Sequence, residues 1–144
     1  MPPAMRDRTI RPVLAVSAAV FRDGRVLIAH RTRPPQLWSL PGGTVEAGET
    51  LIEAAARELR EETGVEAEFL GYVGHREVIL RDQEGVLTGH YVVLAFAARW
   101  HAGEARPGPE ALEVRWVEHD ALGAFETTEG LAEIVAVAHR LAQA

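Results

Sequence analysis

Three glutamates carry the clearest chemical potential in this chain, because Glu61 and Glu62 follow Glu58 at intervals of three and four residues. On a helix, side chains at this spacing share one face, so their carboxylates would converge. Like charges repel, and the helix dipole also disfavours an acid near a helix C-terminus. A hard divalent cation such as Mg²⁺, which prefers oxygen ligands, would offset both effects. The spacing predicts a metal site; the alternative is a solvated acidic face paired with Arg57 and Arg60.

A longer motif surrounds these acids and favours the metal site over a solvated face. Gly43 is followed after five residues by Glu49, and after seven more by RELREETGV, residues 57–65. Seven fixed identities at fixed spacing arise by chance on the order of once in 10⁸ starting points. The motif resembles the Nudix box and departs from it at no position. Its strand-rich flanks and closing helix are similar to the rest of that family's domain.

The resemblance implies both a fold and an activity. The implied fold class is α/β, a Nudix α/β/α sandwich in which a mixed β-sheet lies between helices. The implied activity is Mg²⁺-dependent hydrolysis of a phosphoanhydride bond in a nucleoside diphosphate linked to another group, with Mn²⁺ as an alternative ion. An ion suits this chemistry, because a pyrophosphate oxyanion repels an attacking water, and a metal neutralises that charge and lowers the pKa of the water.

The same resemblance assigns metal ligands residue by residue. It implies that Glu58 and Glu62 bind the metal, and that Glu61 binds a further ion or polarises water. The backbone carbonyl of Gly42, just before the first glycine of the motif, is expected to join these carboxylates.

Four other positions match structural elements of the family's motif, namely Gly43, Glu49, Arg57 and Gly64. Glu49 and Arg57 look like the salt bridge that holds the loop against the helix. At Gly43, and at Gly42 before it, we expect a sharp turn and close approach of the backbone to a ligand or ion. Gly64 would let the chain leave the helix abruptly.

A carboxylate outside the helix could act as a general base. Similar enzymes often place such an acid in the loop before a late strand, and Glu110, six residues before Trp116, occupies that kind of position. Glu104 and Glu113 compete for the role, and a glutamate in a loop is usually only solvated. If Glu110 is not the base, Glu61 is the candidate within the helix.

Arginines and aromatic residues supply candidates for substrate binding. Arg31 and Arg33 could hold a phosphate through bidentate contacts, or could be ordinary exposed loop residues. Trp38 and Tyr91 could stack on a base or ribose, but packing within the sheet is the favoured interpretation. The six histidines show no metal-ligand spacing, so we assign them no role.

Hydrophobic patterning predicts the elements that position these residues. A capping box, Thr50 with Glu53, starts one helix that Gly64 ends. Apolar residues at helical spacing predict a second helix over Thr128 to Ala142. Turn residues at Asp23-Gly24 and at 82–85 separate apolar runs that we expect to be strands. The expected strands are 13–21, 25–29, 65–73, 77–80, 90–100 and 114–117, with Pro41-Gly42-Gly43 as a tight turn and 101–109 as a long loop.

Composition bounds the class of protein. With 144 residues and 47% hydrophobic content, we expect a single domain over 13–144, preceded by a flexible lead-in over 1–12. The absence of cysteine excludes disulfides, thiolate metal sites and a cysteine nucleophile. A net charge of −6 argues against a nucleic-acid binder. No apolar run has the length of a membrane span, which predicts a cytoplasmic protein without membrane contact.

The sequence does not identify the substrate, because the motif positions metal and pyrophosphate but neither base nor distal group. Residues 37–43 and the short chain resemble small bacterial ADP-ribose pyrophosphatase-like and nucleotide-sanitising enzymes, and we favour ADP-ribose. The alternatives are oxidised or ordinary nucleoside triphosphates, then dinucleoside polyphosphates. A non-catalytic nucleotide-sensing module is the rival from another class. We also expect a homodimer, because relatives frequently pair through the sheet and its flanks.

Overall fold

The centre of the fold is strand β1 (Val13–Arg22). From Val13 to Phe21 it pairs in parallel with β6 (Leu87–Ala102). Its other edge has two successive antiparallel partners, first β4 (Gly42–Thr44) at Ala15 to Ser17, and then β2 (Arg25–Arg31) at Phe21 and Arg22. The computed structural model describes residues 9–143. Of the expected lead-in, residues 1–8 lie outside the described residues, and residues 9–12 belong to no helix or strand.

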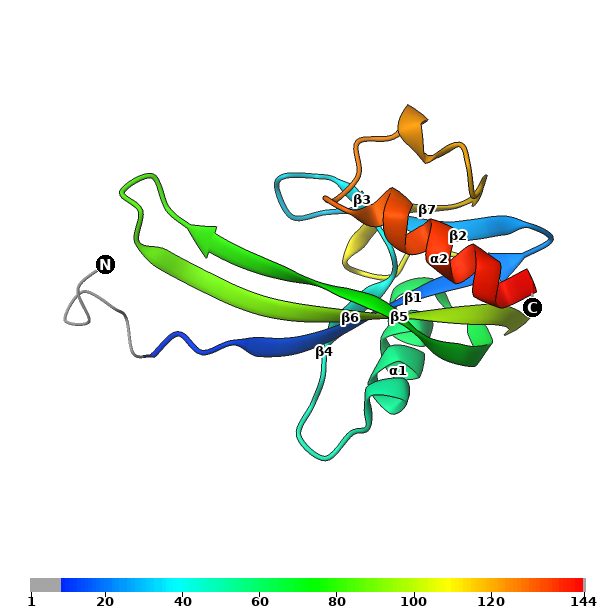
Figure 1. Ribbon diagram of the computed structural model, residues 1–144, viewed down its shortest axis with the longest axis horizontal. Coiled ribbons are helices and arrows are strands. Elements are labelled where there is room, and N and C mark those ends of the chain that lie inside the picture. Colours follow the sequence, from blue (N-terminus) through cyan, green and yellow to red (C-terminus); the bar gives the residue numbers. More distant parts are fainter. Residues whose placement is uncertain (1–8, 144) are drawn as a thin grey trace.

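The remaining strands extend this sheet on both sides. They are β3 (Trp38–Ser39), β5 (Glu66–Arg81) and β7 (Ala111–Glu118), so that residues 9–143 contain one mixed sheet of seven strands. β3 and β7 pair with β2, whereas β5 pairs with β6. The long β5–β6 hairpin projects beyond the rest of the molecule (Figure 1).

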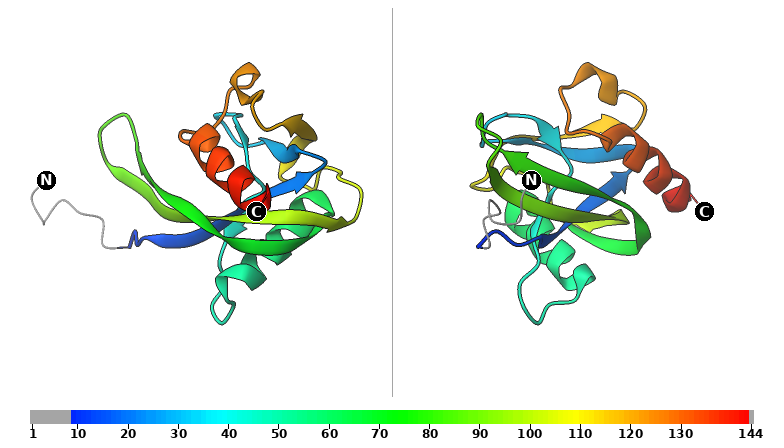
Figure 2. Two further views of the ribbon diagram at one scale, coloured as in Figure 1. Left: turned by 45° about the vertical axis from the view of Figure 1, so that its right-hand side comes forward. Right: turned by 60° about the vertical axis from the view of Figure 1, so that its left-hand side comes forward.

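Two helices cover opposite faces of the sheet, which confirms the predicted α/β/α sandwich. Helix α1 (Leu51–Thr63) packs Ala54, Ala55 and Leu59 against alternate residues of β1, such as Val16 and Ala18. Successive strand residues point to opposite faces. Helix α2 (Leu131–Gln143) therefore packs on the other face, where β1 presents Ala19 and Phe21 (Figures 1 and 2).

Neither helix within residues 9–143 is long and apolar enough to cross a membrane. A short 3-10 helix, Leu122–Ala124, precedes α2.

Three local predictions were wrong. Residues 65–73 and 77–80 do not form two strands, because β5 runs continuously through register shifts next to Gly71 and Gly74. The expected turn at Gly42 and Gly43 is the start of β4, an extended segment paired with β1. Helical spacing also predicts a buried stripe of Ile52, Ala55, Leu59 and Thr63 on α1, but Ile52 is 39% exposed and Ala54 is buried in its place.

Candidate functional site

Helix α1 places the acidic residues, and local signals fix both of its ends. At the start, Glu53 N–H donates to Thr50 Oγ1 at 3.1 Å, and Thr50 N–H donates to the Glu53 carboxylate at 2.8 Å. At the end, Gly64 adopts the left-handed conformation at φ 75° and its N–H donates to Arg60 O. The predicted capping box and glycine stop are therefore both present, and they set the rotation at which the glutamates emerge.

Arg57 joins the helix to the loop that precedes it. Its Nε and one terminal nitrogen donate to the two carboxylate oxygens of Glu49 at 2.7 and 2.8 Å, so the expected salt bridge is bidentate. The same terminal nitrogen donates to Thr44 O at 3.0 Å, at the end of β4. The other terminal nitrogen donates to Glu58 at 2.8 Å and reaches Glu61 at 3.4 Å. One guanidinium group thus holds the loop, β4 and two of the acids.

The carboxylate of Glu62 is held by a backbone group rather than by Arg57. The Gly42 N–H donates to Glu62 Oε2 at 2.9 Å, which joins the C-terminal turn of α1 to the start of β4. Glu58 and Glu62 therefore lie beside the same two-glycine segment. The carbonyl of Gly42, expected as a metal ligand, belongs to this segment as well.

Lack of space for a side chain, rather than a turn, explains why glycine occupies positions 42 and 43. A Cβ on Gly43 would overlap the carboxylate of Glu58, and a Cβ on Gly42 would overlap the Val16 carbonyl on β1. The close approach expected of these glycines is therefore made to a glutamate side chain and to a neighbouring strand. Any side chain at Gly43 would have to displace the carboxylate.

Burial and mutual repulsion set the charge state of the two held acids. The pKa of Glu62 is raised to about 7, chiefly by burial and also by the charges of Glu58 and Glu110, against the hydrogen bond from Gly42 and the charge of Arg31. Burial likewise raises the pKa of Glu58, although Arg57 opposes the shift. Glu49 differs, because hydrogen bonds from Arg57 and from the Glu46 backbone lower its pKa to about 2.

Glu61 does not share this environment. Its side chain is 60% exposed, compared with 14% for Glu58, and within residues 9–143 its one ion pair is the long contact to Arg57. Within residues 9–143, no three Asp, Glu or His side chains are gathered closely enough to enclose an ion by themselves. The convergence expected of three carboxylates is thus limited to Glu58 and Glu62.

The loop after β6 closes the C-terminal end of α1. Arg106 N–H donates to Thr63 O at 2.9 Å, and Gly108 N–H donates to Glu62 O at 2.7 Å. A Cβ on Gly108 would overlap the Glu61 carbonyl, so only glycine permits this approach. The sequence predicted a long loop here but gave no sign that its backbone satisfies the free carbonyls of the acidic helix.

This contact brings Glu110 to the site. Its carbonyl accepts hydrogen bonds from the N–H and hydroxyl of Thr32, at 3.2 and 3.3 Å, so its backbone is held between α1 and the end of β2. Its side chain is exposed, and its charge raises the pKa of both Glu58 and Glu62. The two competing acids are paired elsewhere, Glu104 with Arg22 and Glu113 with Arg115.

The predicted substrate-binding residues have different surroundings. Arg31, at the end of β2, is half-buried, and its charge lowers the pKa of Glu62, so it lies within electrostatic range of the acidic site. Arg33 is exposed in the following loop. Trp38 is only 9% exposed, stacked on His30 at 4.6 Å and edge-on to Phe125, so its role is packing, as favoured.

The sequence interpretation missed Arg76, on β5. Its charge and that of Arg31 act on one another, although 45 positions separate them in the chain. A single arginine inside a strand-like run carries no local signal of function, and only the sheet pairing reveals its position.

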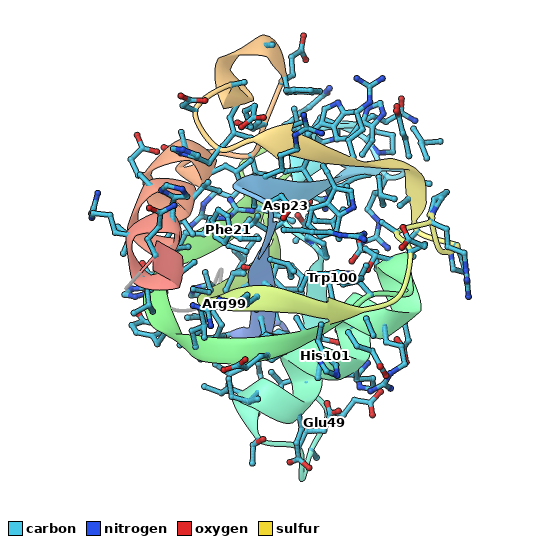
Figure 3. All side chains as sticks on the ribbon, turned by 90° about the vertical axis from the view of Figure 1, so that its right-hand side faces the viewer. Phe21, Asp23, Glu49, Arg99, Trp100 and His101 are labelled. Carbon is cyan, nitrogen blue, oxygen red and sulfur yellow. The ribbon has the colours of Figure 1, made fainter. Side chains whose placement is uncertain are left out.

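A pocket elsewhere on the protein does not belong to this site. Phe21, Asp23, Arg99 and His139 line it at the C-terminal end of α2. In Figure 3 the labelled Phe21, Asp23 and Arg99 gather there, whereas Glu49 lies apart from them beside α1.

Comparison with known proteins agrees with the resemblance found in the sequence. The model of the NUDIX domain family matches residues 11–137. A protein of Mycobacterium tuberculosis named "Putative 8-oxo-dGTP diphosphatase 2" is 42% identical over 96 residues, which are 65% of this chain and 64% of that protein. An ADP-ribose pyrophosphatase of Methanocaldococcus jannaschii is 32% identical over 111 residues, 76% of this chain and 63% of that protein. The chain thus spans slightly less than two thirds of each of these relatives.

A solved structure shows the same architecture. The MutT protein of Bacillus halodurans superposes with a TM-score of 0.72 at 26% identity, covering 86% of this chain and 80% of that chain.

Arg57→Ala should lower both the stability of the protein and the affinity of the acidic site for a divalent ion, the latter about 10- to 100-fold. Arg57→Lys should recover only part of the loss, because a lysine cannot make the bidentate contact to Glu49. Urea unfolding and calorimetric Mg²⁺ titration would measure both effects. The matched control is Arg60→Ala, one turn away, whose ion pair is long and exposed. A double-mutant cycle showing no coupling between Glu49 and Arg57 would contradict this role.

Glu62 should make the metal-free protein less stable as pH rises. Its pKa is about 7 when folded, against 4.5 for an unperturbed glutamate carboxyl, so the unfolded chain loses its proton first and stability falls between these values. The loss is on the order of 3 kcal/mol. In EDTA, Glu62→Gln should be more stable than wild type above pH 7 and lose that advantage below pH 4.5. Parallel stability curves of the two proteins across this range would refute the effect.

Proposed function

The chain belongs to the NUDIX family, and from this premise we propose that it is a divalent-metal-dependent hydrolase of phosphoanhydride bonds in nucleoside diphosphates linked to another group. The observation that carries the proposal is the pair of held carboxylates, Glu58 and Glu62, beside Gly42 and Gly43 in an unbroken Nudix motif. An acidic face that was merely solvated would require neither the burial nor the glycines.

The residues present suit a hard divalent ion, Mg²⁺ or Mn²⁺. The donors are carboxylate oxygens, which such ions prefer, and burial with mutual repulsion holds the Glu58 and Glu62 pKa values above their usual range. A cation would relieve that repulsion. Mg²⁺ commonly combines one or two carboxylates with water and substrate oxygens, so two well-held glutamates suffice. Glu58 and Glu62, with the Gly42 carbonyl, would hold the ion, and Glu61 could bind a further one.

The bound ion would neutralise the pyrophosphate charge and make water more acidic. The other tasks fall to the chain itself. Glu110 accepts the proton of the attacking water, since its carboxylate is exposed and its charge reaches both held acids. Arg57 positions Glu58 and takes no direct part in the reaction. Arg31 attracts the substrate anion, which the net charge of −6 would otherwise repel.

ADP-ribose is the substrate we favour, supported by the relative of that activity in Methanocaldococcus jannaschii and by the similarity of residues 37–43 to such enzymes. The second candidate is an oxidised nucleoside triphosphate, which the Mycobacterium tuberculosis relative supports. A panel of ADP-ribose, 8-oxo-dGTP, dGTP and a dinucleoside polyphosphate, assayed with Mg²⁺ and with Mn²⁺, would decide between them. Binding without turnover of any of these would favour a nucleotide sensor instead.

Glu58→Gln and Glu62→Gln should each leave a folded protein whose kcat is at least about a hundredfold lower, because each loses a charged ligand. Glu53→Gln is the matched control, since that side chain caps the start of the same helix and its charge does not contribute to the pKa shift of Glu58 or Glu62. Steady-state kinetics on the best substrate of the panel would measure the effect. Near-normal kcat in either variant would overturn the metal assignment.

Glu110→Gln should lower kcat by about 10² to 10⁴ with little change in apparent Mg²⁺ affinity, because a general base acts in the reaction step while a ligand also controls ion binding. Glu104→Gln is the control within the same loop and should change neither quantity. If Glu110→Gln keeps full kcat at every pH tested, Glu110 is a surface residue and Glu61 becomes the candidate base.

We also propose that the protein is a homodimer, formed through the projecting end of the sheet (Figure 1). Leu14, Ile79, Leu80 and Val86 are each about half exposed there, at 46–51%. Light scattering should give twice the chain mass of 15.7 kDa, and Ile79→Glu should shift the protein to the monomer. Ile52→Glu, on α1, is the control for an exposed apolar side chain. A monomer at micromolar concentration in the wild type would refute the dimer.

A further inference from the structure

Arg76 lies on the sheet face that α2 covers. Pairing places Thr44, Ala15, Val93 and Arg76 in one row across β4, β1, β6 and β5. Ala19 and Ala97, each four residues further along their strands, pack against α2. Since residues an even number apart on a regular strand share a face, Ala15 and Val93 face the α2 side. Arg76, directly opposite Val93, faces the same side.

The neighbouring row is made of small residues. It consists of Gly42, Ser17, Ala95 and Gly74. Ile134, in the first turn of α2, packs against this row, because a Cβ on Gly74 would meet Ile134 Cδ1 at 2.8 Å. This small-residue floor therefore carries no bulky side chain between Gly42, which holds Glu62, and the strand that carries Arg76. Three strand spacings, roughly 14 Å, separate its two ends.

The charge of Arg76 lacks a bonded partner within the described part of the chain. It is half-buried, and its guanidinium group makes no hydrogen bond or ion pair with any group in residues 9–143. Burial lowers its pKa, as does the charge of Arg31, while Glu129 acts in the opposite direction without touching it. The side chain of Arg31 is equally without a hydrogen bond in these residues.

Arg31 connects this cation to the acidic site, because its charge acts on Glu62 as well as on Arg76. Two half-buried guanidinium groups thus lie within electrostatic range of each other, and one of them lies within electrostatic range of Glu62. Keeping such cations together without an acceptor costs stability. A bound anion would supply the acceptor, and guanidinium groups match phosphate through paired donors.

We propose that Arg76 and Arg31 together bind a phosphate group of the substrate, the one on the far side of the scissile bond from the acidic helix. The substrate would lie over the small-residue floor, with one phosphate at Glu58 and Glu62 and the next between the two arginines. This assignment rests on the proposed function and adds a binding residue, Arg76, that the Nudix motif does not contain.

The direct test is binding rather than turnover. Isothermal titration in EDTA with inorganic pyrophosphate, with ADP and with adenosine would be run on the wild type, Arg76→Gln, Arg76→Lys and Arg31→Gln. Arg81→Gln is the matched control, since Arg81 lies on the same strand but is exposed and bonded to Gly85 O. Arg76→Gln should weaken pyrophosphate and ADP binding about 10- to 100-fold, the range for hydrogen bonds to charged groups. Arg76→Lys should retain part of the affinity, and Arg81→Gln all of it.

Two further readouts separate binding from a purely structural role. Arg76→Gln should unfold at the same temperature as the wild type or higher, because it removes an unpartnered cation. In turnover it should raise KM with little change in kcat. Equal pyrophosphate affinity in Arg76→Gln and wild type, or no measurable binding to wild type, would overturn the site. If pyrophosphate binds through Arg76 but no nucleotide is hydrolysed, the site stands and the proposed hydrolase function fails.

Discussion

The arrangement of the acidic site depends on the ion-pair network of Arg57. Its guanidinium group bonds to Glu49 in the loop, to the Thr44 carbonyl at the end of β4, and to Glu58 on its own helix. A side chain with fewer donors, or without a planar arrangement of them, could not make these contacts at once. Because β4 continues from the segment that holds Glu62, this one residue fixes both held carboxylates relative to the sheet. The loss of Arg57 would free the loop, the strand and Glu58 together.

The site also depends on the absence of side chains. Gly43 leaves room for the Glu58 carboxylate, Gly42 for β1, and Gly108 for the end of α1. Each glycine lets backbone approach a group that must come close, and none of the three is needed for a left-handed conformation. Backbone at these glycines thus packs closely against the acidic helix. It buries the carboxylates of Glu58 and Glu62 without surrounding them with apolar side chains. That arrangement explains how charged groups can be held firmly and still face a substrate.

The parts of this structure that the sequence could predict are those governed by near neighbours. Thr50, Glu53 and Gly64 determine the ends of α1 within a few residues of themselves, and the spacing of Glu58 and Glu62 follows from helical geometry. The unbroken motif led to the family and so to the fold. The continuity of β5 through Gly74 and the extended conformation of Gly42 depend on pairing with distant strands, and could not be inferred locally. The candidate binding role of Arg76 could not be predicted for the same reason, because it depends on Arg31 and on the residues paired with Arg76 across the sheet.

Strand β1 pairs with two different strands, β4 and then β2, along one edge. In a continuous sheet, the backbone separates the two faces, so side chains on one face cannot contact those on the other. Here β1 stops pairing with β4 at Ser17 and starts pairing with β2 only at Phe21. The sheet therefore forks, with a gap in the pairing along this edge of β1. The Pro41 carbonyl accepts the Ala18 N–H across the base of this gap. The charge of Arg31, on the strand beyond the fork, acts both on Glu62 from the helix on one face and on Arg76 on the other face. In the proposed binding mode, one substrate molecule would therefore contact groups from both faces of the same sheet.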